Sequence, residues 1–545
     1  MPIMPTASML LVLSVGLRGS TAEESPPTAA GRCCKANAGC TDPEECLDPK
    51  VQPFCAASKE NCEGKCKHIW CSGGGGGSSN FSVDASHALH NATEQYVSFT
   101  FDLSAWFGFA ATNNFSDPNF IAAARSFRPA LLRMGGTAGD NTTYDMGGRV
   151  SSESGIPFRT MTRPQFDAMC DFASAAGWQI VFGLNALQGF AGASGWAWDG
   201  TNARELMEYA VRKKCPVVGW ELGNEPNLNN KNGAVQTGAG VAKRFSSLLK
   251  LMQSVYDGKL GLGTPTSPWV VGPDVTKGGV SNGFLGDFLA AFQPASALSC
   301  VTWHHYYTAG KGGVVSTAEY LDPQFLDTYV DAAQVASAAV QKFRADSGTN
   351  PMLWMGETSG AGGATSGAHL VIGRFLGVFW SADKLGAAAR TGHSVVMKQT
   401  YLYTAFAANA DGSGVAVSPE YWVALLWKRH MGAGALAVSG GGGLVRVYAS
   451  LATGGVVAVV IINLGTNATQ VPVEITGSGA VAQQHERYTL TAWPDATDMQ
   501  ANATAVNGKE VRLGPGGVAP TLTPASAHGS VVSVPAHSVT FAVFR

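Results

Sequence analysis

The chain has 545 residues, of which 14% are charged and 45% hydrophobic, and its 37 Lys and Arg nearly balance its 39 Asp and Glu. This hydrophobic fraction excludes a mainly disordered chain, and a formal net charge of −2 disfavours a general binder of nucleic acid or of an acidic membrane surface. The length exceeds what one hydrophobic core supports and indicates several domains.

Residues 1–22 are typical of a secretory signal peptide. The apolar run 7–16 is shorter than a membrane span, and Ser20 and Ala22 offer small residues for cleavage. A disordered apolar N-terminus is the alternative, because no Lys or Arg precedes the run. Six Asn-x-Ser/Thr sequons support secretion and predict glycosylation at Asn80, Asn91, Asn114, Asn141, Asn467 and Asn502. We expect a secreted or lysosome-like lumenal protein without a membrane span, and leave peripheral membrane association open.

Cysteines concentrate in residues 32–71, where eight of the 11 occur: Cys33, Cys34, Cys40, Cys46, Cys55, Cys62, Cys66 and Cys71. An even count in a short stretch behind a signal peptide predicts a disulfide-rich module whose pairing stays open. A zinc module is the alternative, although the CxxC…CxxC spacing of zinc ribbons is missing. The ligand of the module, if it is more than a spacer, also stays open. Cys170, Cys215 and Cys300 lie in apolar surroundings and are expected to be buried thiols.

The Gly/Ser-rich residues 72–82 predict a flexible linker. In residues 83–425, strand-like and helix-like stretches alternate, as in repeated βα units. Eight short apolar runs predict strands at 96–102, 130–134, 179–184, 218–223, 269–275, 301–306, 352–357 and 394–399. Amphipathic stretches between them predict helices at 163–176, 203–212, 241–256, 325–345 and 370–388. This alternation favours a (β/α)8 TIM barrel. An open doubly wound sheet is the alternative, but no GxGxxG follows the first strand.

Residues 426–545 are rich in β-type runs separated by Gly, Pro and Asn, which predicts a C-terminal β-sandwich domain. The expected fold class is therefore α/β: a TIM barrel, a C-terminal sandwich and a small N-terminal disulfide-rich module.

Two glutamates stand at strand ends of the predicted barrel. Glu225 follows the fourth strand in VVGWELGNEPN, and Glu357 ends the seventh in MLWMGETSG. Active sites of such barrels lie at the carboxyl ends of the strands. A facing pair of carboxylates is what glycoside hydrolysis requires, one as the acid and one as the nucleophile or stabilising anion. Either glutamate alone is compatible with a capping or ion-pair role, whereas the pair favours catalysis.

The chain resembles the heparanase-type enzymes of glycoside hydrolase family 79. The resemblance is carried by LLRMGGT at 131–137, IVFGLNAL at 180–187, GWELGNEPN at 219–227, VVGPDV at 270–275, VTWHHYY at 301–307, GETS at 356–359 and DKLGAAARTGHSVVMKQ at 383–399. It implies a retaining β-glucuronidase in which Glu225 is the general acid/base, with a raised pKa, and Glu357 the ionised nucleophile. It further implies substrate-binding or site-lining roles for Asn224 at the sugar 2-hydroxyl, Tyr306 beside Glu357, and Asp102, Thr137, Gln399, Gly362 and Gly363 around the uronate.

His304 and His305 are adjacent on a strand, so they point to opposite faces and cannot easily bind one metal ion. A hydrogen-bonding role at the site is expected for His304. The sequence contains no metal-ligand spacing and no cofactor motif, and we expect neither metal nor cofactor.

The segment 138–171 is short and carries only Arg149, Arg159 and Arg163 as positive charges, whereas the animal heparanases have an excised linker and a basic run there. Since polysulfated glycans are held by clustered cations, we expect a single-chain, monomeric enzyme acting on another uronic-acid-containing polysaccharide or proteoglycan glycan. Endo and exo cleavage stay open. The alternatives are a catalytically silent glycan-binding protein, which the two glutamates disfavour, and a glycosidase of the same clan with a different sugar.

Overall fold

The computed structural model describes residues 31–34, 69–72, 80–104, 115–147, 159–190, 197–228, 236–309, 313–362, 365–399, 407–408, 415–441, 443–477 and 484–545. The chain divides into two compact units, Met1–Gly77 and Ser78–Arg545. In the first unit, β1 (Gly31–Cys34) pairs antiparallel with β2 (Ile69–Ser72). The predicted signal peptide, the disulfides of the cysteine-rich module, most of the linker and the sequon at Asn114 lie outside the described residues.

Eight parallel strands of the second unit form a closed barrel, which confirms the predicted (β/α)8 architecture. They are β5 (Val97–Asp102), β6 (Ala130–Gly135), β9 (Trp178–Leu184), β10 (Val217–Leu222), β11 (Trp269–Thr276), β12 (Cys300–Ala309), β13 (Met352–Gly362) and β14 (His393–Gln399). Each strand pairs with the next along the chain, and β14 closes the barrel against β5. Glu225 thus follows the fourth strand and Glu357 lies on the seventh, as expected from their spacing.

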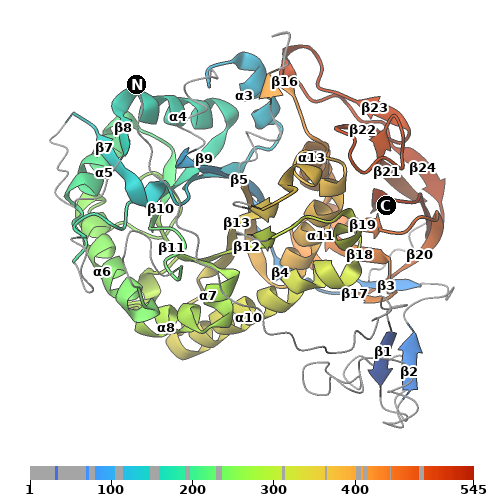
Figure 1. Ribbon diagram of the computed structural model, residues 1–545, viewed down its shortest axis with the longest axis horizontal. Helices are drawn as coiled ribbons and strands as arrows, with labels where there is room; N and C mark the ends of the chain where they lie inside the picture. Colours follow the sequence, from blue (N-terminus) through green and yellow to red (C-terminus); the bar gives the residue numbers. More distant parts are fainter. Residues whose placement is uncertain are drawn as a thin grey trace, which may run out of the picture. The chain divides into compact units, whose positions relative to one another are not determined.

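Helices surround the barrel, as Figure 1 shows. The longer ones are α3 (Pro118–Arg125), α4 (Arg163–Ala176), α5 (Thr201–Lys213), α6 (Gly238–Val255), α8 (Phe284–Ala291), α10 (Pro323–Ser347), α11 (Leu376–Arg390) and α13 (Pro419–His430). The helix α4 illustrates the local signals: a capping box of Thr162 and Gln165 starts it, and Gly177 in the left-handed conformation ends it. The expected helix at 370–388 begins only at Leu376, because Gly373 has a φ of 74°.

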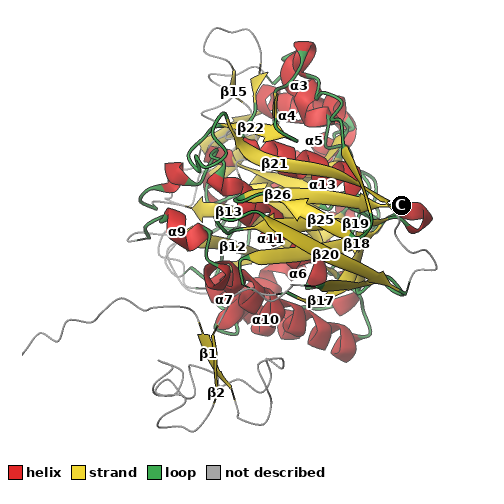
Figure 2. Cartoon of the chain, turned by 90° about the vertical axis from the view of Figure 1, so that its right-hand side faces the viewer, coloured by secondary structure: helices red, strands yellow, loops and turns green. Residues whose placement is uncertain are grey.

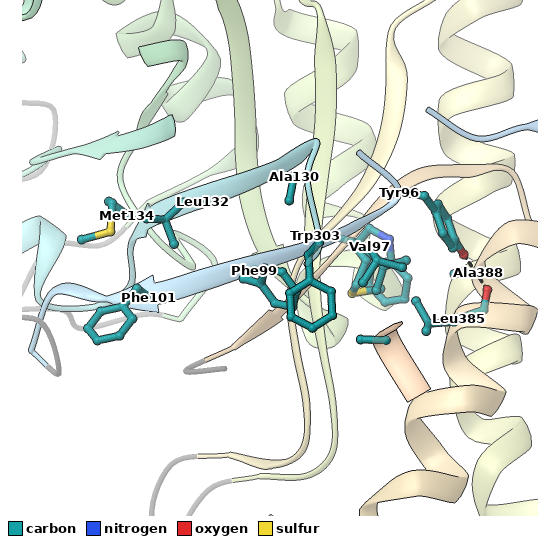
Figure 3. Close-up of a cluster of buried hydrophobic side chains, with 14 of the residues drawn as sticks. Tyr96, Val97, Phe99, Phe101, Ala130, Leu132, Met134, Trp303, Leu385 and Ala388 are labelled. Carbon is teal, nitrogen blue, oxygen red and sulfur yellow. Dashed lines mark hydrogen bonds between the residues drawn. The ribbon is translucent and has the colours of Figure 1, made fainter. Parts of the chain in front are cut away.

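Apolar side chains fill both faces of the barrel wall. Figure 3 shows Val97, Phe99 and Phe101 of β5 beside Leu132 of β6 and Leu385 of α11, in the layer between strands and helices. A separate cluster draws its buried residues from barrel strands alone and fills the interior: Leu131, Val181, Val218, Val271, Cys300, Trp354, Val395 and Met397. Because side chains alternate along a strand, Arg133, two residues beyond Leu131, faces the same interior nearer the carboxyl ends.

The C-terminal region is β-rich, as predicted, and Figure 2 shows its long strands. Its strands are β17 (Gly434–Gly440), β18 (Val445–Leu451), β19 (Val457–Asn463), β20 (Thr469–Thr476), β21 (Gln484–Trp493), β22 (Ala503–Val506), β23 (Lys509–Val511), β24 (Ala525–His528), β25 (Val531–Val534) and β26 (Ser538–Phe544). They belong to one 12-stranded sheet. Residues of β18, β19 and β26 share an apolar cluster with residues of β20 and β25, so the sheet folds over a common core.

Two strands of this sheet come from before the barrel, in a segment that we assigned to the linker and the barrel. They are β3 (Phe81–Asp84), which lies between β17 and β20, and β4 (His90–Asn91), which pairs with β17. The reason is the alternation of β3: Phe81 and Val83 are buried in the sheet's apolar cluster, while Ser82 and Asp84 are half-buried. The sheet therefore joins both ends of the Ser78–Arg545 unit.

The barrel and the sheet meet where α11 packs against β18. Arg446 of β18 forms ion pairs with Asp383 of α11 and, at 2.8 Å, with Asp327 of α10. The Tyr448 hydroxyl donates a hydrogen bond to Asp383 at 2.7 Å. A Cβ atom at Gly386 would overlap the Tyr448 ring, so the close approach of helix and strand requires glycine there.

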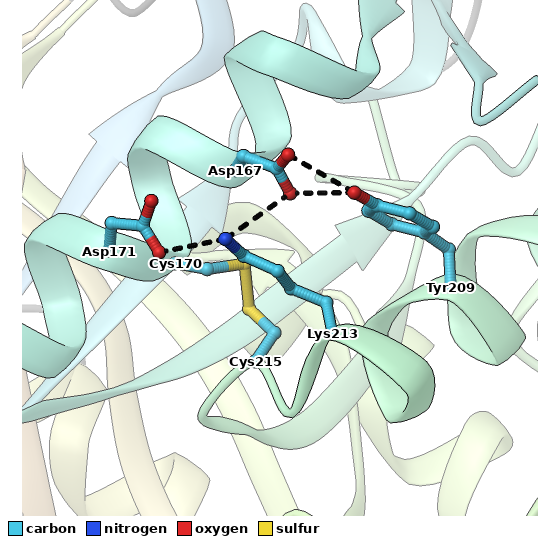
Figure 4. Close-up of a disulfide and its surroundings, with 6 residues drawn as sticks. All are labelled: Asp167, Cys170, Asp171, Tyr209, Lys213 and Cys215. Carbon is cyan, nitrogen blue, oxygen red and sulfur yellow. Dashed lines mark hydrogen bonds and ion pairs between the residues drawn. A yellow bond between two sulfur atoms is a disulfide. The ribbon is translucent and has the colours of Figure 1, made fainter.

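A disulfide between Cys170 of α4 and Cys215, just after α5, corrects our expectation of two buried thiols (Figure 4). Their Cα atoms lie 5.2 Å apart although 45 positions separate them in sequence, and only the packing of the two helices brings them together. Beside the disulfide, Lys213 lies 2.9 Å from Asp171 (Figure 4). Of the cysteines whose side chains are described, Cys300 is a buried free thiol, as expected.

Among the sequons in the described residues, Asn80, Asn91, Asn467 and Asn502 are exposed and Asn141 is half-buried. No helix in the described part of the chain is both long and apolar enough to cross a membrane.

Candidate active site

Arg133 of β6 forms the centre of a buried charge network at the carboxyl ends of the barrel strands. Its guanidinium lies 2.7 Å from Glu221 of β10, 3.3 Å from Asp274 of β11 and 2.9 Å from Glu357 of β13. It also donates a hydrogen bond to the Asn224 side-chain oxygen at 3.1 Å. One fully buried arginine of β6 therefore links side chains from three other barrel strands or the loops that follow them.

Glu225 is presented by a tight turn after β10. Gly223 has a φ of 83° and Glu225 a φ of 49°, so two residues adopt left-handed conformations that an ordinary strand end does not need. The Glu225 backbone N–H donates to the Asp274 carbonyl at 2.9 Å, and that of Asn224 donates to the Asp140 carboxylate at 3.3 Å. These bonds hold a turn that leaves the Glu225 side chain 16% exposed.

Glu357 is aimed by an irregularity in the sheet. The pairing of β12 with β13 passes from Trp303 opposite Met355 directly to His304 opposite Glu357, which leaves Gly356 as an extra residue. Such a bulge re-aims the side chain that follows it. The Tyr306 hydroxyl donates to one Glu357 oxygen at 2.5 Å, and Arg133 binds the other at 2.9 Å.

His304 connects Glu225 to Asp274. Its Nδ1 lies 3.2 Å from a Glu225 oxygen and its Nε2 3.2 Å from an Asp274 oxygen. Burial disfavours a charged imidazole, but the nearby carboxylates, that of Glu357 first, outweigh burial and raise the pKa of His304 to about 9. At this pKa His304 carries a positive charge at neutral pH.

The two predicted catalytic carboxylates lie close together. One oxygen of Glu225 and one of Glu357 lie within 4.8 Å of each other, with a nitrogen of His304 within the same distance of both. These three groups are the residue types that bind metal ions. However, both ring nitrogens of His304 already face carboxylates, which favours a hydrogen-bond network over a metal site.

Burial and the neighbouring charges act in opposite directions on the pKa values of this network. Burial raises the pKa of Glu221 well above its ordinary value, although Arg133 opposes that effect. Burial also acts on Asp274, but Arg133 and His304 outweigh it and lower the pKa of Asp274. Burial raises the pKa of Glu357, whereas His304 and Arg133 oppose that effect. Arg133 and His304 thus supply the positive charge that faces these carboxyl groups.

The remaining predicted residues lie at the same end of the barrel. Asp102 ends β5 and packs against Gly136, next to the exposed Thr137, and the half-buried Gln399 ends β14. Gly362 ends β13 beside the Tyr306 ring, where a Cβ atom would lie 2.6 Å from the ring. Gly363 lies outside the described residues.

Four ionisable residues of the site were not predicted from the sequence: Arg133, Asp140, Glu221 and Asp274. Three of them occur inside the apolar runs LLRMGG, VVGWEL and VVGPDV. A charge in a strand that is otherwise buried on both faces must have a partner, and that signal was available in the sequence. Asp140, in a short 3₁₀ turn after β6, had no comparable signal.

Residues 95–386 match the family described as "Glycosyl hydrolase family 79, N-terminal domain". The chain is 29% identical to heparanase of Bos taurus over 402 residues, which cover 63% of this chain and 67% of the bovine protein. It is 26% identical to baicalin-beta-D-glucuronidase of Scutellaria baicalensis over 438 residues, or 74% and 78% of the two chains. The crystal structure of a 4-O-alpha-L-rhamnosyl-beta-D-glucuronidase from Fusarium oxysporum shares the fold, with a TM-score of 0.60, 15% identity, and coverage of 85% of this chain and 99% of the other.

Proposed function

The chain belongs to glycosyl hydrolase family 79, and from that premise we propose that it hydrolyses β-glucuronide linkages with retention of configuration, using Glu225 and Glu357. The observation that carries this proposal is the distance of at most 4.8 Å between their nearest oxygens. Retaining glycosidases hold their two carboxyl groups about 5 Å apart, whereas inverting ones need roughly 6.5–9.5 Å to admit a water molecule.

Glu357 acts as the nucleophile in this proposal. Tyr306 and Arg133 each bind one of its oxygens, which fixes the carboxylate and supports its ionised form. In the first step a bond forms between a Glu357 oxygen and the anomeric carbon while the bond from that carbon to the leaving oxygen breaks. The Asn224 amide, whose oxygen Arg133 binds, is in turn proposed to hold the sugar 2-hydroxyl.

Glu225 gives its proton to the leaving oxygen in that first step. In the second step it removes a proton from the water that attacks the anomeric carbon, and the bond to Glu357 breaks. After the first transfer Glu225 is an anion with cationic His304 3.2 Å away. This ion pair stabilises the state in which Glu225 must accept a proton.

We propose a glucuronide within an acidic, uronic-acid-containing glycan as the substrate. The names of the bovine and Scutellaria relatives support this sugar. Asp102, Thr137, Gln399, Gly362 and Gly363 are proposed to line the uronate subsite, and the first four stand at the carboxyl ends of the strands or just beyond. The few positive charges in the segment 138–171 make densely sulfated heparan sulfate the less favoured glycan.

Secretion, or residence in a lysosome-like lumen, is part of the proposal. The disulfide between Cys170 and Cys215 supports it, because disulfides persist mainly in oxidising compartments. Exposure of Asn80, Asn91, Asn467 and Asn502 is consistent with glycosylation there.

The test is hydrolysis of an aryl β-glucuronide at mildly acid pH, with an aryl β-glucoside as the sugar control. Glu225→Gln is expected to lose roughly 10²- to 10⁴-fold in rate, and Glu357→Gln to fall to background. The matched control is Glu208→Gln, a half-buried glutamate of α5 that pairs only with Arg204 among described cations. Its activity should equal that of the wild type.

Two further readouts separate the roles. The first sugar released should be the β-anomer, detected by proton NMR before mutarotation. Azide should rescue Glu225→Ala as a β-glycosyl azide and Glu357→Ala as an α-glycosyl azide, because azide takes the place of water in the first variant and of the nucleophile in the second. An α-anomer released first would exclude the retaining mechanism, and turnover of the glucoside alone would assign a different sugar.

A further inference from the structure

Lys384 is a buried lysine on the side of the barrel wall that faces away from the proposed catalytic carboxylates. It belongs to α11, is 1% exposed and reaches the outer faces of β12 and β13. The mechanism proposed above does not use it. A buried ammonium needs several acceptors to offset its loss of hydration, so the groups around Lys384 show what it holds in place.

The Lys384 ammonium has three hydrogen-bond acceptors for its three N–H groups. Nζ lies 2.7 Å from Thr358 Oγ1, 3.0 Å from His305 Nδ1 and 3.3 Å from the His305 carbonyl oxygen. Its distances to the ring centroids of Tyr307, Tyr329 and Trp380 are 4.1, 5.1 and 5.3 Å. Burial lowers the pKa of Lys384, whereas cation–π contacts with these rings favour the charged form.

The residues that Lys384 binds are the immediate neighbours of the site. His305 lies between His304 and Tyr306 on β12, and Thr358 follows Glu357 on β13. Because alternate side chains of a strand face opposite sides, contacts on the outer face set the direction of the inner side chains. Thr358 also donates to the His305 carbonyl at 2.5 Å, so Lys384 binds both partners of one bond between the strands.

This bond lies just beyond the bulge at Gly356. The ladder of β12 and β13 loses its regular register between Trp303 and His304, and His305 opposite Thr358 is the second pair after the shift. A bulged ladder fixes side-chain direction less well than a regular one. The placement of the Tyr306 hydroxyl against Glu357 therefore depends on contacts outside the ladder.

We propose that Lys384 is a positioning residue of the glycosidase reaction: it locks β12 to β13 beyond the bulge and so aims the Tyr306 hydroxyl at Glu357. This inference rests on the proposed function, because it assigns Glu357 the role of nucleophile. Lys384 itself touches neither Glu357 nor Tyr306 in the hydrogen bonds described for it, and acts through His305 and Thr358.

The test is Lys384→Met, which keeps the side chain's length and removes its donors. We expect kcat on an aryl β-glucuronide to fall about 10- to 100-fold, as for a small misplacement of reacting groups, with KM unchanged within about 2-fold because substrate binding is untouched. In a double-mutant cycle, Tyr306→Phe should cost less in the Lys384→Met background than in the wild type. Thermal melting of each variant reports whether the chain is folded.

Lys428→Met is the matched control. Lys428 of α13 is half-buried and donates to the carbonyls of Glu94 and Pro129 at 2.6 and 2.5 Å. These residues precede β5 and β6, so this lysine serves the amino ends of the strands, far from Glu357. The variant is expected to lose stability and keep kcat.

Thr358→Val is the second variant. It tests the same positioning role if Lys384→Met does not fold. It removes the hydroxyl that accepts from Lys384 and donates to His305, and it should lower kcat with little change in KM. A folded Lys384→Met or Thr358→Val enzyme with wild-type kcat would overturn the inference, as would strict additivity with Tyr306→Phe. A wild-type enzyme that cleaves no glucuronide would instead overturn the proposed function.

Discussion

His304 is held as a cation by the carboxylates around it, and this has a consequence for stability. Its pKa is about 9 in the folded protein and 6.5 in the reference state. A raised pKa stabilises the fold most below pH 6.5, and the contribution is lost as the pH rises through 9. The difference corresponds to roughly 3 kcal/mol.

We therefore expect the wild type to have a larger free energy of unfolding than His304→Gln at pH 6.5, and this difference to decrease as the pH rises to 9. Urea denaturation of both proteins at several pH values measures the difference. His393→Gln is the control of opposite sign: burial lowers the pKa of His393 to about 3, so its contribution should change only between pH 6.5 and 3. A pH-independent difference for His304→Gln would contradict the assigned charge.

The sequence was sufficient to predict the two glutamates that are proposed to act on the substrate. It was not sufficient to predict the buried ionisable residues that hold them in place. Glu225 lies in the turn after one apolar strand and Glu357 on another, and both apolar runs are visible in the sequence. Arg133, Glu221 and Asp274 stand on three different strands, and their pairing exists only after the barrel closes. The pKa of each depends on that pairing, so no reading of single positions predicts it.

Among the elements, α4 and α5 are tied by the disulfide of Cys170 and Cys215. It closes a loop of 45 residues, and loops of this size stabilise a fold by roughly 2–4 kcal/mol when cross-linked. We expect Cys170→Ala/Cys215→Ala to lower the free energy of unfolding by that amount without changing KM, because neither cysteine adjoins the site. Reduction of the wild type should reproduce the loss, and equal denaturation midpoints would show that the bond contributes nothing.

A second prediction concerns the contact of α11 with β18. Gly386→Val would drive a side chain into the Tyr448 ring and push apart Asp383 and Arg446, at a cost of about 2–3 kcal/mol. The control is Gly286→Ala, an exposed glycine of α8 with open space around its Cβ position, which should stabilise the protein by about 0.5–1 kcal/mol. Thermal melting compares the two; a tolerated Gly386→Val would mean that the helix and strand can separate freely.

The barrel strands were predictable because they are short apolar runs, and α4, α5, α6 and α10 because their apolar residues recur at a helical period. The eight barrel strands agree with the predicted runs except at their ends, where β12 continues to Ala309 and β13 to Gly362. The four-residue strand β3 was not predictable. It follows a Gly/Ser-rich run, and its partners lie hundreds of residues further along the chain.

For the whole molecule, the position of β3 predicts how far the chain can be shortened. A chain that begins at residue 95, where the family match begins, lacks β3 between β17 and β20. Two unpaired strand edges and the apolar partners of Phe81 and Val83 would then be exposed. We expect that chain to aggregate on size-exclusion chromatography, whereas one that begins at residue 78 should be monomeric with the melting temperature of the full chain. A soluble, equally stable chain from residue 95 would contradict this.

During synthesis, β3 is made long before its partner strand β20. Phe81 pairs with Val473, 392 positions later. At about 5–20 residues per second, β3 leaves the ribosome roughly 20 to 80 s before β20 exists. Until β17 and β20 have been made, the apolar side chains of β3 have no place in this sheet. Pairing of β3 within its sheet therefore begins only after all eight barrel strands have been synthesised.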